Sequence, residues 1–136
     1  MRKADVNNAA ALAIKTMAQE FKKVGEPFFT KDQYAQKLSE ALANMEFAVA
    51  IAEKNKLIGF AHWYYADNQA FVEDLIVDPA QKGKGHGKAL VNFALQTCKN
   101  DKVQSLSVLM PFGSKGVDFA KKFGIKPVSI ELKKKL

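Results

Sequence analysis

One glycine- and lysine-rich segment has the clearest chemical meaning in the chain; it reads Lys82-Gly83-Lys84-Gly85-His86-Gly87-Lys88. Its three glycines stand at alternate positions, between residues typical of a strand and residues typical of a helix. Glycine lets the backbone approach a ligand closely, and the first amides of a helix have no partner inside the helix. The lysines add to the positive end of the helix dipole. The segment therefore predicts a phosphate site; the alternative is a flexible turn with solubilising lysines.

The spacing of these glycines excludes two common nucleotide-binding motifs. A P-loop has four residues between its glycines and a Ser or Thr after its lysine, whereas three residues separate Gly83 from Gly87 and Ala89 follows Lys88. The dinucleotide motif G-x-G-x-x-G requires a glycine where Lys88 stands. The phosphate ligand is therefore of another kind.

The positive charge of the chain is concentrated around and after this loop. Residues 82–136 contain 12 lysines and three acidic residues, whereas residues 1–81 contain 9 basic and 11 acidic residues. This distribution predicts an anionic partner for the C-terminal part. A solvated lysine surface is one alternative. A basic nucleic-acid-binding domain is another, although the chain lacks the sequence signatures of the common nucleic-acid-binding modules.

Length and composition limit the class of protein. The 136 residues, 48% of them hydrophobic, predict a single domain over residues 1–136. No apolar run approaches the roughly 20 residues of a membrane helix, and the first residues do not resemble a secretory signal. Cys98 is the only cysteine, so neither an intrachain disulfide nor a cysteine-based zinc site can form. We expect a cytoplasmic protein that holds no metal and does not enter a membrane.

Periodicity and turn residues predict the elements that position the loop. Thr30 and Gln33 form the pattern of a capping box, and the helix after the glycine loop has Leu90, Phe93, Ala94 and Thr97 on one face. We expect, in order, a helix through Ala10 and Ala13 ending near Gly25, a helix from Thr30, strands over 46–52, 57–65 and 70–77, a helix over 87–99, a strand over 103–110, a short helix over 114–123 and a last strand over 128–132. An antiparallel meander followed by a strand–helix–strand crossover makes an α+β domain with a mixed sheet.

The glycine segment resembles motif A of the GNAT superfamily, the acetyl-CoA-dependent N-acetyltransferases. That motif is (Arg/Gln)-x-x-Gly-x-(Gly/Ala), and Lys82 to Gly87 matches it except that Lys stands at the first position. Phe119 to Ile125 resembles the late helix of the family, and Met1 to Ala4 resembles its short first strand. Gly59 to Asp74 has a weaker similarity to diamine acetyltransferases. The resemblance implies a twisted, mostly antiparallel mixed sheet with the order β-α-α-β-β-β-α-β-α-β, flanked by helices.

The resemblance also implies which residues hold acetyl-CoA. The amides of Gly83 to Lys88, with Lys82, would bind the pyrophosphate. The backbone of the strand entering the loop would pair with the pantetheine arm. The implied cofactor-binding residues are Leu75, Ile76, Val77, Lys82, Gly83, Lys84, Gly85, His86, Gly87 and Lys88.

Glu73 is the candidate catalytic base, because relatives often carry a carboxylate at this place in the strand. Alternation along a strand predicts that Glu73 shares a face with Leu75 and Val77, while Asp74 points the other way. The alternatives are a surface role for Glu73 and a proton relay through His62 on the adjoining strand. The Tyr that usually protonates the leaving thiolate aligns with Ala120, and Tyr64 or Tyr65 is an alternative donor.

We therefore expect direct transfer of an acetyl group from acetyl-CoA to a primary amine. One alternative is a catalytically weak or silent acyl-CoA-binding relative, which the missing Tyr favours. A nucleic-acid-binding domain is less favoured. The acceptor is a small-molecule or peptide amine whose identity the sequence does not encode, and the apolar strands allow a homodimer.

Overall fold

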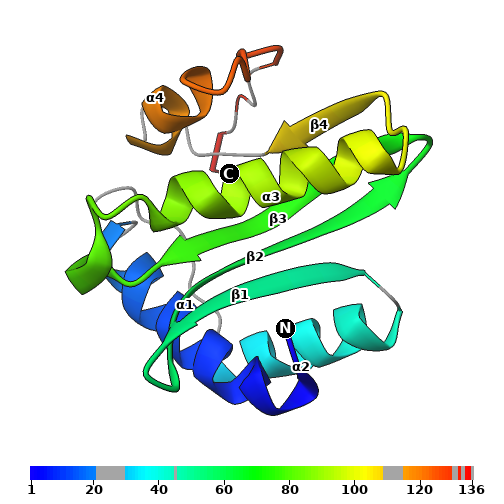
Figure 1. Ribbon diagram of the computed structural model, residues 1–136. Helices are drawn as coiled ribbons and strands as arrows, with labels where there is room; N and C mark the ends of the chain where they lie inside the picture. The colour runs from blue at the N-terminus through cyan, green and yellow to red at the C-terminus, as the bar shows by residue number, and fades with distance from the viewer. Residues whose placement is uncertain (21–29, 45, 109–114, 130–131, 133, 136) are drawn as a thin grey trace.

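We describe a computed structural model of the chain, in which residues 1–20, 30–44, 46–108, 115–129, 132, 134 and 135 are described (Figure 1). The elements are a short 3₁₀ helix η1 (Lys3–Asp5), helices α1 (Val6–Glu20) and α2 (Lys31–Ala43), strands β1 (Phe47–Glu53), β2 (Lys56–Ala66) and β3 (Gln69–Val77), the 3₁₀ helix η2 (Pro79–Gln81), helix α3 (His86–Asn100), strand β4 (Ser105–Val108) and helix α4 (Lys115–Lys121).

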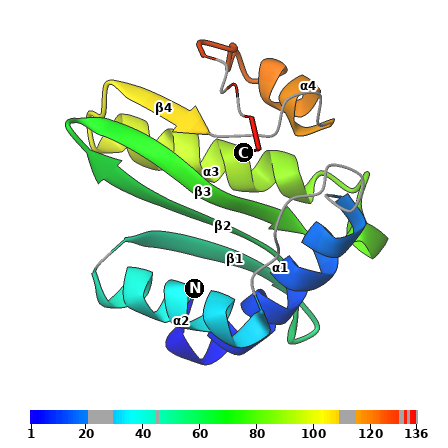
Figure 2. The same ribbon diagram turned by 180° about the vertical axis from the view of Figure 1, so that it is seen from behind.

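The four strands form one sheet in the order β1-β2-β3-β4. The first three form an antiparallel meander, and β4 pairs with β3 in parallel after the crossover through α3. Helices α1 and α2 cover one face of the sheet and α3 covers the other, as the two opposite views show (Figures 1 and 2). The expected α+β class with a mixed, mostly antiparallel sheet is confirmed.

Alternation along β2 divides the core between the two faces of the sheet. Phe60 packs with the first two helices, whereas Ala61 and Trp63 pack with α3. Tyr34 and Trp63 are the largest side chains that are almost fully buried, each about 1% exposed. The sheet therefore lies between two apolar layers. This packing fixes the position of β3, from whose end the glycine loop continues.

Local sequence explains the ends of several elements. The Thr30 hydroxyl accepts from the Gln33 amide at 3.2 Å, while the Gln33 side chain accepts from the Thr30 amide at 2.9 Å, which confirms the capping box. Lys54 and Asn55 connect β1 to β2, and Asp67 and Asn68 connect β2 to β3, all with positive φ. Two consecutive left-handed residues match the twist of the flanking strands, which is why short polar turns close both hairpins.

Two expected strands at the chain ends are wrong where the structure describes them. Residues 3–5 form η1 instead of a strand, because Asp5 accepts bonds from both the backbone and the side chain of Arg2. The Met1 ammonium group alone reaches the sheet, donating to the Ala48 carbonyl at 2.7 Å. Of the strand expected over 128–132, Val128, Ser129 and Leu132 have no strand structure, and the other two residues lie outside the described part. The expected end of the first helix near Gly25 and the first residue of the helix expected over 114–123 also lie outside it.

Candidate active site

The chain leaves β3 through an anchored turn. The Asp78 side chain caps η2 by accepting from the Ala80 amide at 3.0 Å, and it lies 3.3 Å from the Lys15 ammonium of α1. The backbone bond from Ala80, followed by the pairing with Lys15, lowers the pKa of Asp78 below its ordinary value despite burial. The Asp78 amide also donates to the Ile58 carbonyl of β2 at 2.8 Å. The start of the glycine loop is therefore fixed to both α1 and the sheet.

The three glycines of the loop are needed for two different reasons. Gly83 and Gly85 adopt φ of 81° and 84°, and a Cβ added to either would meet nothing within 4 Å. Glycine is therefore required at these two positions because the backbone is left-handed there, and not because a side chain would clash. A Cβ added to Gly87 would lie 3.3 Å from Cζ of Phe119 in α4. Glycine is therefore required here because α3 and α4 pack closely at this point.

The start of α3 fits an anion site. The helix begins at His86 with Gly85 as its N-cap, and no side chain caps it. The first bond of the helix runs from the Ala89 amide to the Gly85 carbonyl at 3.0 Å. The preceding amides are those that a helix leaves without a partner within itself, and they carry the positive end of its dipole.

The lysines of the loop lie at its surface. Lys82, Lys84 and Lys88 are exposed, and the Lys84 ammonium donates to the Gln81 side chain at 2.9 Å. Lys88 also borders a groove between α3 and α4, together with Lys122, Phe119 and Phe123. The His86 ring differs from the lysines, because its Nε2 atom is buried and has no hydrogen-bond partner among the described residues. The backbone of His86 stands at the first position of α3, among the amides of the candidate anion site.

Strand β3 continues past its pairing with β4. The described pairs run from Gln69–Ser105 to Val72–Val108, so within the described part of the chain residues 73–77 of β3 have β2 as their only strand neighbour. A small apolar cavity of about 30 Å³ lies beside this stretch, and its lining includes Leu75, Val108, Phe119 and Ala120. The expected pantetheine-binding residues Leu75, Ile76 and Val77 thus lie on the part of β3 that has no described partner on its β4 side, just before the glycine loop.

A bulge interrupts β3 at Glu73. His62 lies opposite Asp74, whereas the next residue of β2, Trp63, lies opposite Val72, so Glu73 is the extra residue. Val72 and Leu75 accordingly pack on the same α3-side core, which regular alternation would forbid. The bulge therefore changes the direction in which the Glu73 side chain points.

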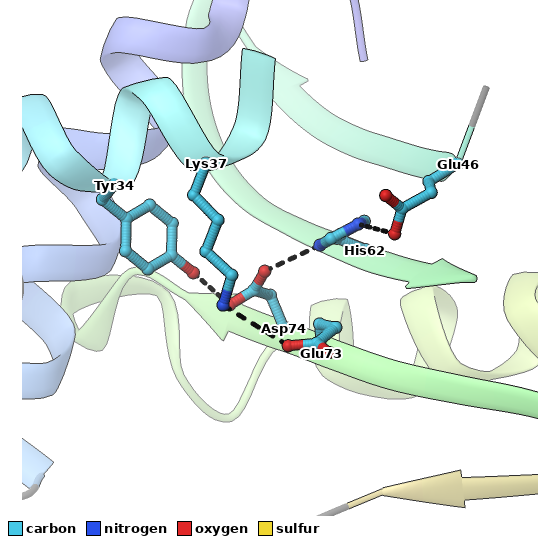
Figure 3. Close-up of polar contacts among 6 residues, drawn as sticks. All are labelled: Tyr34, Lys37, Glu46, His62, Glu73 and Asp74. Atoms are coloured by element: carbon cyan, nitrogen blue, oxygen red, sulfur yellow. Dashed lines mark hydrogen bonds and ion pairs between the residues drawn. The ribbon is translucent and has the colours of Figure 1, made fainter. Parts of the chain in front are cut away.

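Glu73 points toward α2, which contradicts the expected arrangement of faces. Its Oε2 atom lies 3.4 Å from the Lys37 ammonium, and both side chains are substantially exposed (Figure 3). Asp74 also contacts α2, so Glu73 and Asp74 share a side and Leu75 and Val77 lie on the other. The prediction failed because strict alternation was assumed through a bulge.

Four side chains form a polar cluster beside this bulge, the buried Tyr34, His62 and Asp74 and the partly exposed Glu46 (Figure 3). The Tyr34 hydroxyl donates to Oδ1 of Asp74, and Nδ1 of His62 lies 3.0 Å from Oδ2 of the same carboxylate. Nε2 of His62 lies 3.2 Å from Oε1 of Glu46. Of these four residues, sequence analysis considered only His62 for a chemical role; the signal for Asp74 was a second carboxylate, next to Glu73, inside a mostly apolar strand.

The electrostatics of the polar cluster favour a protonated imidazole. Burial by itself lowers the pKa of His62, but the hydrogen bonds and charges of Asp74 and Glu46 outweigh it, so the pKa lies above its ordinary value. Burial, with the neighbouring Asp74 carboxylate, raises the pKa of Tyr34. Tyr34 therefore stays a neutral donor to Asp74.

The tyrosines considered as proton donors lie in other surroundings. Tyr65 donates to Asp101 at 2.6 Å, just beyond the end of α3 that is farthest from the glycine loop. The Tyr64 ring stacks on Phe71, with centroids 5.4 Å apart. Ala120 is buried and lines the apolar cavity. None of these contacts points to Tyr64 or Tyr65 as a substitute for a hydroxyl at position 120.

The strand–glycine loop–helix arrangement, on a mixed sheet flanked by helices, defines the class of protein. Residues 12–125 match the model of the acetyltransferase (GNAT) family, so the chain belongs to that family and is an acyltransferase. No curated protein sequence matches the chain.

Solved structures share the fold at low sequence identity. The PaiA N-acetyltransferase of Thermoplasma acidophilum in complex with coenzyme A is 16% identical, with a TM-score of 0.78 over 90% of this chain and 84% of that one. A predicted acetyltransferase of Clostridium acetobutylicum with acetyl-CoA is 14% identical, with a TM-score of 0.76 over 99% and 92%. The aminoglycoside N-acetyltransferase AAC(6')-Iy in complex with CoA is 16% identical, with a TM-score of 0.75 over 100% and 91%.

Metal sites and membrane-spanning helices are both absent from the described ranges. No group of three or more His, Cys, Asp or Glu side chains there could hold a metal ion. None of the helices in those ranges has the length and apolar character needed to cross a bilayer.

Proposed function

We propose that the protein transfers an acetyl group from acetyl-CoA directly to a primary amine. The observation that carries the proposal is the loop after β3, where two left-handed glycines lead into a helix start that no side chain caps. Membership of the GNAT family supports it. The coenzyme A complexes of PaiA from Thermoplasma acidophilum and of the aminoglycoside enzyme provide further support.

In this proposal the backbone holds the cofactor. The amides of residues 83–88 bind the pyrophosphate, with Lys82, Lys84 and Lys88 contributing charge. The peptide groups of Leu75, Ile76 and Val77 pair with the amides of the pantetheine arm, because this part of β3 has no described partner on its β4 side. The thioester then lies near the bulge, at the edge of β3 past Val72.

Proton removal is the energetic difficulty of the reaction. An alkyl amine with a pKa of about 10.4 must lose a proton before it attacks, which at pH 7 costs roughly 4.6 kcal/mol. Glu73 is the proposed base, directly or through a water, because it is partly exposed at the bulge. The amine nitrogen forms a bond to the thioester carbon while a peptide N–H near Ile76 polarises the carbonyl. The carbon–sulfur bond breaks with its electron pair on sulfur, and the second proton that the nitrogen loses on becoming an amide passes to water.

The leaving thiolate in this proposal has no tyrosine to protonate it, because Ala120 stands at that place. A thiol has a pKa of about 8.5, so the thiolate leaves without full protonation. General acid assistance contributes about 10²–10⁴-fold, whereas orienting two reactants contributes about 7–11 kcal/mol. We therefore expect slow but real turnover. A silent acyl-CoA-binding role is the second candidate, favoured by Ala120 alone.

The acceptor is proposed only as a primary amine of a small molecule or peptide. Location in the cytoplasm and formation of a homodimer also remain predictions from the sequence. The test is incubation with acetyl-CoA and mixed amines, including diamines, aminoglycosides and peptides, followed by mass spectrometry and thiol release. Products 42 Da heavier than an amine, an acetyl group in place of a hydrogen, are expected; cofactor binding without any product would instead favour the silent role.

A further inference from the structure

The geometry of the polar cluster fits an imidazole that carries a proton on each nitrogen. Both ring nitrogens of His62 face carboxylate oxygens, at 3.0 Å for Asp74 and 3.2 Å for Glu46. A neutral imidazole donates through only one nitrogen, so the second contact requires one more proton on His62 or on Glu46. The Asp74 side chain is about 4% exposed and that of His62 about 3%, whereas that of Glu46 is about 25% exposed. The extra proton therefore sits between a buried ring and a carboxylate that reaches solvent.

The same cluster ties the bulge to its surroundings. Asp74 is the residue after Glu73, and it lies opposite His62 at the point where the β2–β3 register shifts. Its two bonds join β3 to β2 through His62 and to α2 through Tyr34. A one-residue slip of β3 would move Asp74 out of both bonds and would turn the following apolar residues to the opposite face. The bonds of Asp74 therefore specify which residue is the extra one.

We propose that the polar cluster is a positioning device for acetyl transfer, which fixes the β3 bulge and with it the Glu73 carboxylate and the peptide groups of residues 74–76. This inference rests on the proposed function, since it assigns the cluster to the same transfer step. Tyr34, Glu46, His62 and Asp74 are positioning residues, and Glu73 is the group that meets the amine.

The positioning depends on pH through His62. The charged or titratable groups around the ring come from every element packed on it: Tyr34 and Lys37 from α2, Glu46 before β1, and Glu73 and Asp74 from β3 (Figure 3). Because the pKa of His62 is raised, the doubly bonded ring is fully present below its ordinary pKa and is lost as pH rises through the raised value. The pH profile of kcat should therefore fall at high pH, as His62 loses its second proton, after the rise at lower pH that amine deprotonation produces.

The test compares four variants of the cluster with two matched controls. Asp74→Asn and His62→Gln should lower kcat about 100-fold, as expected for a small displacement of reacting groups, with KM for acetyl-CoA within about threefold. Tyr34→Phe should lower kcat about tenfold, because Asp74 loses its bond to α2. The controls are Tyr65→Phe, whose hydroxyl bonds the exposed Asp101, and Glu40→Gln, on the surface of α2. Both should keep kcat within about twofold.

Glu46→Gln tests the pH dependence of kcat, which should not change if the polar cluster only stabilises the fold. It removes one of the two carboxylates that retain the second proton, so the falling limb of the pH profile should move about one pH unit lower. The His62 ring resonances, followed by NMR in the unmodified protein, should titrate at the pH of that limb. If Asp74→Asn does not fold, Glu46→Gln and Tyr34→Phe provide the test. Thermal melting and CoA titration then check that these two variants are folded and bind the cofactor.

The outcomes separate the inference from the function on which it rests. If the unmodified protein binds CoA but acetylates no amine, the proposed function and this inference both fail. If it acetylates an amine while Tyr34→Phe keeps full kcat and Glu46→Gln leaves the falling limb in place, the inference alone is overturned. Loss of the second His62 proton at or below pH 6.5 in the NMR titration also overturns it.

Discussion

The glycine loop and the β3 bulge are two neighbouring parts of the candidate site that use different chemical groups. The loop offers peptide groups, held by Gly83 and Gly85 in conformations that other residues rarely adopt. The bulge offers side chains, held by the contacts of Asp74 and His62 with residues far away in the sequence. The comparison teaches that a cofactor site made of backbone is encoded locally, whereas a catalytic site made of side chains depends on the register of the whole sheet.

The first prediction tests the backbone part of this comparison. Gly85→Val should weaken CoA binding about 100-fold, because a β-branched residue in the left-handed region is strained and its side chain would stand where the pyrophosphate approaches. Calorimetric titration with CoA measures the effect. Gly124→Val is the matched control, since Gly124 also has a positive φ of 77° but follows α4. Equal loss of affinity in both variants would contradict a specific role for the loop.

The second prediction tests the side-chain part. Glu73→Gln should lower kcat about 30-fold, most strongly at low pH, because the amide cannot take the amine's proton. Its affinity for CoA should stay within about twofold, which separates the bulge from the loop. Steady-state rates between pH 6 and 9 measure the effect, and Glu53→Gln, at the exposed end of β1, is the control. An unchanged pH–rate profile would remove Glu73 from the mechanism.

Prediction from sequence succeeded where a residue type has one local meaning. The alternate glycines and the Thr30–Gln33 capping box each describe the backbone of a few adjacent residues, and the structure has both. The family resemblance rested on the same kind of local pattern, and it led to the family that the chain belongs to.

Prediction failed where a contact between distant elements decides the outcome. Glu73 was placed on the wrong side because strict alternation was assumed through the bulge, and the residues that contact Asp74 there, His62 and Tyr34, are distant from it in sequence. The buried face of α3 is Leu90, Ala94 and Cys98, while Phe93 is 55% exposed. Of the expected face, Leu90 and Ala94 are buried, whereas Phe93 and Thr97, each three positions further on, are not, and only the direction of the helix across the sheet decides which of these positions face the core.

A third prediction separates the two reasons for glycine within the loop. In Gly87→Ala the new methyl group would press on Phe119 at 3.3 Å, so the free energy of unfolding should fall by about 1 kcal/mol and CoA affinity by about threefold. Phe119→Leu in the same chain should restore the stability, because it removes the ring edge. Denaturant unfolding of both variants measures this. No rescue would mean that Gly87 is required for its backbone, like its two neighbours.

The smallest expected effect comes from a single surface charge. Lys88→Ala should weaken CoA binding about threefold at low salt and less at 0.5 M salt, because an exposed ammonium acts on phosphate only through a screened field. Lys135→Ala, exposed near the C-terminus, should have no effect. A loss with Lys88→Ala as large as that with Gly85→Val would shift the site from the peptide groups to the side chains.

The central claim is that the peptide groups between β3 and α3 bind the diphosphate of coenzyme A. Calorimetric titration of CoA into the unmodified protein tests it most directly. We predict saturable one-to-one binding with a Kd of about 1–100 µM, corresponding to roughly −5 to −8 kcal/mol. Absence of saturable heat up to about 1 mM CoA, an affinity weaker than about −4 kcal/mol, would contradict the account.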